Sequence, residues 1–118
     1  MYYVIRNNIR FVAKAKVPID PLRSADPGLL ILVSLADGPK HGYAMLNEIE
    51  DLSGARPGPG TLYGAISRLE EHGFIEPLEA DDRRTPYQLT DAGRRHLADH
   101  LKAMETLARI GARRLATT

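Results

Sequence analysis

Proline and glycine residues divide the middle of the chain into segments that are long enough only for short helices. Proline favours the first turn of a helix, and glycine commonly follows its last residue. These breakers therefore predict three successive helices joined by short connections. The proline and glycine residues that break the chain in this way are Pro27, Gly38, Pro39, Gly54, the "PGPG" at residues 57–60 and Gly73.

Apolar residues within the three segments recur at helical spacing. The run from Leu29 to Val33 is too continuous for an exposed helix, so we expect the first helix to be central in the core. The second and third segments instead carry one apolar stripe each, which predicts amphipathic helices. The stripes consist of Tyr43, Met45, Leu46, Ile49 and Leu52, and of Leu62, Ile66 and Leu69.

The segment after the third helix has the pattern of a β-hairpin. Residues 74–90, "FIEPLEADDRRTPYQLT", contain two short apolar runs separated by a polar turn from Asp81 to Thr85. Thr90 can then cap a long final helix. Three helices, a two-stranded wing and a long last helix predict a mainly α fold, the winged helix-turn-helix.

The final helix carries a heptad-like apolar seam. Its members are separated alternately by four and three residues, a spacing typical of helices that pack along one another. We therefore expect this helix to form a dimer. The seam consists of Leu97, Leu101, Met104, Ala108, Gly111 and Leu115.

These patterns divide the 118 residues into three parts. The winged domain is complete without the N-terminal arm, so deleting residues 1–20 is expected to leave the fold intact. Within the arm, Ile5, Ile9 and Val12 can form one apolar helix face. The parts are a basic arm and linker at residues 1–25, the winged helix domain at 26–90 and the dimerisation helix at 91–118.

Composition and motifs exclude several kinds of site. The chain has no cysteine, and hence no disulfide or thiolate metal site. It has no recognisable nucleophile motif or phosphate loop, so we expect neither an enzyme nor a cofactor. His96 and His100 share a helix face, but zinc needs three or four protein ligands and we expect no metal. No apolar run approaches the roughly 18 residues of a membrane span, and we expect a cytoplasmic protein.

Charge is unevenly distributed, although the net charge is only +1. Residues 1–25 contain five basic residues and one acidic residue, and residues 91–118 contain six basic and three acidic residues. Residues 57–90 instead contain three basic and six acidic residues. The basic ends permit an anionic partner. Solvated basic surfaces without a partner are an equally open interpretation.

The "PGPG" stretch gives the third helix an exposed start. Pro59 fits the first helical turn, and Gly58 and Gly60 leave this end without bulky side chains. Free amides at a helix N-terminus attract phosphate, and small residues allow close approach to a groove wall. The stretch therefore predicts a narrow helix tip suited to DNA.

Three motifs occur together along the chain, from about Leu29 to Leu101: "HGYAM", "PGTLYGAISRLEEHGFIE" and "YQLTDAG". In this order and spacing they resemble the PadR-type transcriptional regulators, bacterial winged-helix repressors named for control of phenolic acid decarboxylase. The resemblance implies a homodimeric repressor that binds a palindromic operator in double-stranded DNA. It also implies release from DNA by a small effector at the dimer interface.

The resemblance further implies which residues contact DNA. The hydroxyl of Tyr63 and the guanidinium of Arg68 would mainly hold phosphates, whereas the wing arginines would reach the backbone or the minor groove. Two departures from relatives affect affinity: Gly58 replaces a serine or threonine, and the wing carries Asp81 and Asp82. The implied DNA contacts are Gly60, Thr61, Tyr63, Gly64 and Arg68 on the third helix, and Arg83 and Arg84 on the wing.

The sequence leaves other roles open for these residues. Tyr63 can be partly core, Arg68 can pair with Glu71, and the wing arginines can offset the neighbouring aspartates. The competing function is a winged-helix module that binds protein and not DNA, which the acidic centre of the chain favours. Salt dependence separates the two functions, because phosphate contacts release counterions.

Overall fold

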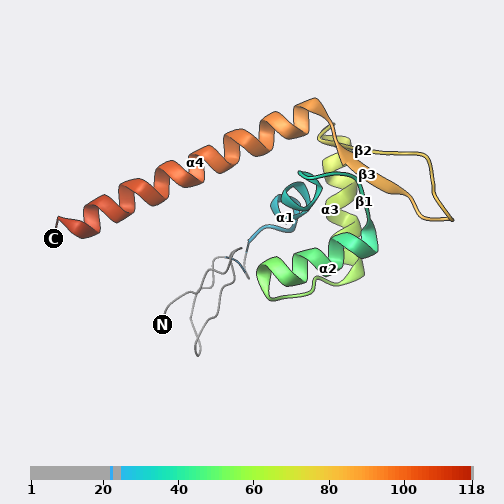
Figure 1. Ribbon diagram of the computed structural model, residues 1–118, viewed down its shortest axis with the longest axis horizontal. Coiled ribbons are helices and arrows are strands. Elements are labelled where there is room, and N and C mark those ends of the chain that lie inside the picture. Colours follow the sequence, from blue (N-terminus) through green and yellow to red (C-terminus); the bar gives the residue numbers. More distant parts are fainter. Residues whose placement is uncertain (1–21, 23–24, 118) are drawn as a thin grey trace.

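The computed structural model describes residue 22 and residues 25–117, which form four helices and one small sheet (Figure 1). The predicted three helices, wing and long final helix are confirmed. The arm proposed for residues 1–25 lies almost entirely outside the described residues. The elements are α1 (Pro27–Leu35), β1 (Lys40–His41), α2 (Gly42–Ser53), α3 (Pro59–Glu71), β2 (Ile75–Pro77), β3 (Pro86–Leu89) and α4 (Asp91–Ala116).

Local capping interactions explain where several helices begin and end. The carboxylate of Asp26 accepts a hydrogen bond of 3.2 Å from the amide of Leu29 at the start of α1. The Thr90 hydroxyl accepts one of 3.0 Å from the amide of Gly93 at the start of α4. Gly54 ends α2 in the left-handed conformation, with a φ of 81°, which glycine adopts readily.

The sheet has three strands, one more than the sequence predicted. Its order is β1-β3-β2 and both pairings are antiparallel, with Lys40 opposite Tyr87 and Ile75 opposite Leu89. From the sequence, the second helix was expected to begin directly after Pro39 and to include residues 40 and 41. That assignment was wrong, because a two-residue strand has no periodicity and forms only by pairing with a strand far along the chain.

The side chain of Lys40 fixes β1 to both neighbouring helices. Its ammonium group donates hydrogen bonds to the carbonyl of Ser34 and to the carboxylate of Asp37, and it lies 3.5 Å from the carboxylate of Glu48. The hydrogen bond and the charge of Lys40 hold the pKa of Asp37 below its usual range. The connection between α1 and α2 is therefore anchored where the sheet begins.

The core lies between α1, α2, α3 and the sheet, with α1 at its centre as predicted. Met45, Leu46 and Ile49 of α2 are buried, but Tyr43 and Leu52 are exposed, contrary to the prediction. At about 100° per residue, these two lie at the edges of the α2 stripe and not at its middle. The buried apolar residues are Ile31, Leu32, Leu35, Met45, Leu46, Ile49, Leu62, Ala65, Ile66, Ile75, Leu89 and Leu97.

The first turns of α4 pack closely against the domain. A side chain on Gly93 would overlap the backbone carbonyl of Phe74, so only glycine allows this approach. The ring of Phe74 stacks on His96, with centroids 4.3 Å apart, and on His72, with centroids 5.7 Å apart. Leu97 completes the contact by entering the core.

Beyond these turns, α4 extends alone. Figure 1 shows its second half leading away from the other elements, toward the side opposite the wing. Every residue from 98 to 117 is exposed in this single chain. The helix therefore presents most of its length to solvent or to a partner.

Candidate nucleic-acid interface

The N-terminal end of α3 is exposed and lacks side-chain capping. Gly58 occupies the cap position, where no side chain accepts a hydrogen bond from the first amides. A side chain added at Gly58 or Gly60 would meet no atom within 4 Å. Packing within the chain therefore does not require these glycines. The predicted contact residue Thr61 is exposed on the same first turn.

The outward face of α3 carries the other residues predicted on this helix. Tyr63 is 50% exposed, and its hydroxyl lies directly against Gly42 at the start of α2. One turn on, Arg68 folds back along the helix, so that its guanidinium lies 3.6 Å from the position of a Cβ on Gly64. Tyr63 is thus not a core residue, but its hydroxyl packs against the backbone of Gly42. Arg68 lies over the predicted contact surface.

The wing ends in a tight turn formed by charged residues. The backbones of Asp81 and Arg84 exchange two hydrogen bonds of 2.7 and 2.9 Å. Between them, Asp82 and Arg83 have positive φ angles of 53° and 68°, as in a type I′ hairpin turn. Arg83 and Arg84 are both exposed.

The predicted arginines keep their charge available at this surface. Within residues 25–117, neither Arg68 nor the two wing arginines form an ion pair with a carboxylate. The alternative pairing of Arg68 with Glu71 does not occur in this structure. The aspartates of the wing contact the arginines through the backbone of the turn.

A groove of about 250 Å³ lies between the start of α2, the face of α3 and the wing. It brings together Tyr63, Arg83 and Arg84 of the predicted set; Gly60, Thr61, Gly64 and Arg68 lie outside its lining. None of the described residues that line it is a carboxylate. The lining consists of His41, Gly42, Tyr43, Tyr63, Arg83, Arg84, Thr85 and Tyr87.

Sequence reasoning missed His41, Tyr43 and Tyr87 as lining residues. Burial raises the pKa of the Tyr87 hydroxyl, and the charge of Glu70 raises it further. The raised pKa favours the protonated hydroxyl, which can donate a hydrogen bond, over the phenolate. His41 and Tyr43 belong to the "HGYAM" motif and Tyr87 to the "YQLTDAG" motif, but no pattern in the sequence indicates that these motifs meet in one groove.

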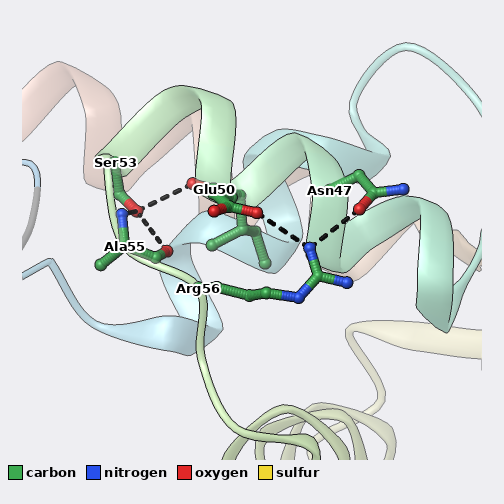
Figure 2. Close-up of polar contacts among 6 residues, drawn as sticks. Asn47, Glu50, Ser53, Ala55 and Arg56 are labelled. Carbon is green, nitrogen blue, oxygen red and sulfur yellow. Dashed lines mark hydrogen bonds and ion pairs between the residues drawn. The ribbon is translucent and has the colours of Figure 1, made fainter.

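Arg56 is a further residue that no motif or spacing in the sequence singles out. It lies in the connection between α2 and α3, and its Nη1 donates hydrogen bonds of 2.9 Å to the side chains of Asn47 and Glu50 (Figure 2). Its guanidinium carbon is 5.7 Å from the ring centre of Tyr43. The start of this connection is held separately, by hydrogen bonds between the Ser53 hydroxyl and the backbone of Ala55.

The predicted dimerisation seam is divided by the fold. Leu97 lies in the core of its own chain, whereas Leu101, Met104, Ala108 and Leu115 are exposed. Leu101 is 44% exposed although it is the first seam residue after the domain. Leu107, 71% exposed, and Ile110 widen the apolar surface beyond the predicted seam.

Other kinds of site find little support among the described residues. No group of three or more possible metal ligands occurs within them. His96 stacks on Phe74, and its ring centre is 6.3 Å from that of His100. No described helix has the length and apolarity needed to span a bilayer.

A model of the "Transcriptional regulator PadR-like family" matches residues 31–99. The chain belongs to this family. The match covers α1, the sheet, α2, α3 and the first turns of α4. Proteins of this family are transcriptional regulators and not enzymes.

Two curated relatives are similar to this chain in sequence. A transcriptional regulator of Mycobacterium tuberculosis is 40% identical over 84 residues, which are 69% of this chain and 78% of the relative. An uncharacterised 37.1 kDa protein in a transposon of Streptomyces fradiae is 47% identical over 87 residues. That match covers 74% of this chain but only 25% of the transposon protein.

Solved structures confirm the winged helix fold. A transcriptional regulator from Clostridium thermocellum superposes with a TM-score of 0.69 at 24% identity, over 82% of this chain and 97% of that one. Bacillus subtilis PadR, solved in complex with operator DNA, gives a TM-score of 0.57 at 25% identity. That similarity covers 63% of this chain and 45% of the Bacillus protein.

Proposed function

We propose that this protein is a sequence-specific DNA-binding repressor that acts as a homodimer on a palindromic operator in the cytoplasm. The observation that carries this proposal is the shared groove of Tyr63 from α3 and Arg83 and Arg84 from the wing. The Bacillus protein of the same fold, solved with operator DNA, supports the choice of ligand.

The charge of the groove fits a phosphate better than the charge of the whole segment indicates. Charges at the surface are screened over roughly 8 to 10 Å, so a bound phosphate responds mainly to the groups that surround it. The described residues that line the groove include two arginines and no carboxylate. Asp82 is nevertheless adjacent to Arg83, and the charge of Glu70 raises the pKa of the lining residue Tyr87, so part of the acidic excess of residues 57–90 also acts on this groove.

The conformation of the wing supports a role for its arginine tip. Left-handed backbone costs an ordinary residue about 1 to 2 kcal/mol relative to the right-handed region, and type I′ turns favour glycine at this place. Arg83 occupies such a position with a φ of 68°. Strained backbone is concentrated at functional sites, which agrees with an arginine selected for its charge and not for the turn.

In the proposed complex, α3 enters the major groove by its N-terminal end. Thr61 offers a hydroxyl and a methyl group to base edges, and Gly60 and Gly64 permit close approach. Tyr63 and Arg68 bind phosphates, which orient a protein on DNA without specifying sequence. The wing arginines then reach the backbone or the minor groove on one side.

The exposed part of the α4 seam supports the homodimer. Leu101, Met104 and Leu115 form more apolar surface than a small soluble chain usually leaves open. Pairing through α4 would give two copies of α3 and hence two half-sites, with centres about 10 base pairs or a multiple apart. A small effector at this dimer interface would release the operator, as the family resemblance implies.

Selection of bound genomic fragments by the purified protein tests the proposal. We expect an enriched palindrome with the half-site spacing given above, and binding that weakens steeply as salt is raised. If no DNA fragment is retained at low salt, the protein-binding module becomes the better account. The six acidic residues of segment 57–90 would then be the first candidates for contact with a protein partner.

A further inference from the structure

The connection between α2 and α3 leads to the tip of α3 that is proposed to contact DNA. Residues 54–58 are Gly-Ala-Arg-Pro-Gly, so Arg56 supplies the only polar side chain. Ser53 fixes the first part of this connection through Ala55. At the other end, the amide of Leu62 bonds to the carbonyl of Gly58, which begins the helical hydrogen bonding of α3.

We propose that Arg56 is a positioning residue for DNA recognition, which fixes the tip of α3 and does not itself bind phosphate. This inference rests on the DNA-binding function proposed above. Its basis is the pair of hydrogen bonds from Nη1 to Asn47 and Glu50, both 2.9 Å, which tie the middle of the connection to α2 (Figure 2).

The partners of Arg56 argue against direct contact with DNA. The carboxylate of Glu50 forms an ion pair with the guanidinium and offsets its charge. A phosphate that approached Arg56 would also approach this carboxylate, and like charges repel. Arg68, Arg83 and Arg84 have no such partner within residues 25–117. Those arginines are therefore better suited than Arg56 to bind phosphate, and Arg56 has a different role.

Arg56 also connects the tip to the groove. Its guanidinium lies 5.7 Å from the ring centre of Tyr43, and Tyr43 lines the groove with Tyr63 and the wing arginines. Arg56 and Glu50 are both partly exposed, so each contact is weak by itself. Loss of the Arg56 side chain is expected to disturb the order of the α3 tip and of Tyr43, while the buried residues of α3 stay in place.

The test compares binding to the selected operator and to scrambled DNA over a range of salt concentrations. Arg56→Ala should weaken operator binding about fivefold and scrambled binding less than about twofold, because a displaced tip loses base contacts. The slope of the logarithm of affinity against the logarithm of salt concentration should not change, because the contacts of Arg68, Arg83 and Arg84 with phosphates, which release counterions, are kept. Thermal unfolding of each variant checks that binding is measured on folded protein.

A second variant keeps Arg56 and removes its acceptors. Asn47→Ala/Glu50→Ala takes away one negative charge, so a phosphate-binding Arg56 would bind DNA more tightly in this background. If Arg56 is a positioning residue, the double variant should instead bind the operator more weakly than the unaltered protein. Asp51→Ala, which removes a neighbouring exposed carboxylate of α2, is the matched control for the change in charge.

Three results would overturn the inference. The first is a salt slope that falls by about 0.9 in Arg56→Ala, which is the value for one lost phosphate contact. The second is unaltered operator binding by Arg56→Ala. The third is unchanged or tighter operator binding by the double variant. If the unaltered protein binds no DNA, the proposed function itself fails, and that outcome is recognised before any variant is compared.

Discussion

The hydroxyl of Tyr63 occupies the space beside Gly42 in which a side chain at residue 42 would begin. Gly42 is the first residue of α2, whereas Tyr63 belongs to the outward face of α3. The missing side chain lets the tyrosine ring extend from α3 across the start of α2 into the groove. Two motifs far apart in the sequence, "HGYAM" and "PGTLYG", are thus coupled through one contact.

Gly42→Ala is expected to displace the Tyr63 hydroxyl and to weaken DNA binding about tenfold, the effect of losing one hydrogen bond to a charged group. The double variant Gly42→Ala/Tyr63→Phe should bind about as well as either single variant, because both changes remove the same contact. Binding titrations on one operator fragment measure all four proteins. Losses that add in the double variant would show that the hydroxyl does not depend on Gly42.

Gly64→Ala should separate stability from binding. An added Cβ would meet only the flexible guanidinium of Arg68, at an ordinary contact distance of 3.6 Å. Replacing glycine by alanine inside a helix should therefore stabilise the fold by about 0.5 to 1 kcal/mol, while the methyl group hinders approach to DNA. Denaturant unfolding and DNA titration give the two values. A stabilised variant with unaltered DNA affinity would remove Gly64 from the contact surface.

Thr61→Ala should change specificity more than affinity for DNA in general. A good base contact contributes about 1 to 3 kcal/mol of discrimination, so the variant should lose preference at one base pair in each half-site. Tyr63→Phe is the control, since the loss of a phosphate contact should weaken operator and scrambled DNA alike. Equal losses on both DNAs for Thr61→Ala would exclude it from base readout.

Leu101→Asp should convert the dimer into monomers and abolish tight operator binding, because it places a charge in the exposed apolar seam of α4. Arg109→Gln is the matched control: it also lowers the net charge by one, but Arg109 lies about 80° or more around the helix from Leu101, Leu107 and Ile110, so this variant should stay dimeric. Sedimentation velocity gives the masses. A stable monomer for the unaltered protein would contradict the dimer directly.

Most of the fold could be predicted from local signals. Asp26, Gly54 and Thr90 act on their own helix ends, and their effect can be read within a few residues of sequence. The β1 strand could not be predicted, because Lys40 becomes a strand residue only through its pairing with Tyr87. Leu97 illustrates the same limit: the heptad pattern continues through it, but the close packing at Gly93 places it in the core.

The candidate site was predictable where the motif is contiguous and not where it is assembled in three dimensions. Thr61, Tyr63 and Arg68 belong to one helix and were implied by the family resemblance of a contiguous motif, and all three are exposed in the structure. His41 and Tyr87 reach the groove from separate strands. Arg56 is defined by partners six and nine residues earlier in the chain, a relationship for which no helical or strand period exists.

The central claim is that DNA phosphates bind where α3 meets the wing, and the salt dependence of binding tests it most directly. The measurement is the slope of the logarithm of affinity against the logarithm of salt concentration, for the unaltered protein and for Arg83→Ala/Arg84→Ala. We predict a steep slope for the unaltered protein, reduced by about 1.8 in the double variant, because each lost phosphate contact removes about 0.9. An identical slope for both proteins would contradict this account of the groove.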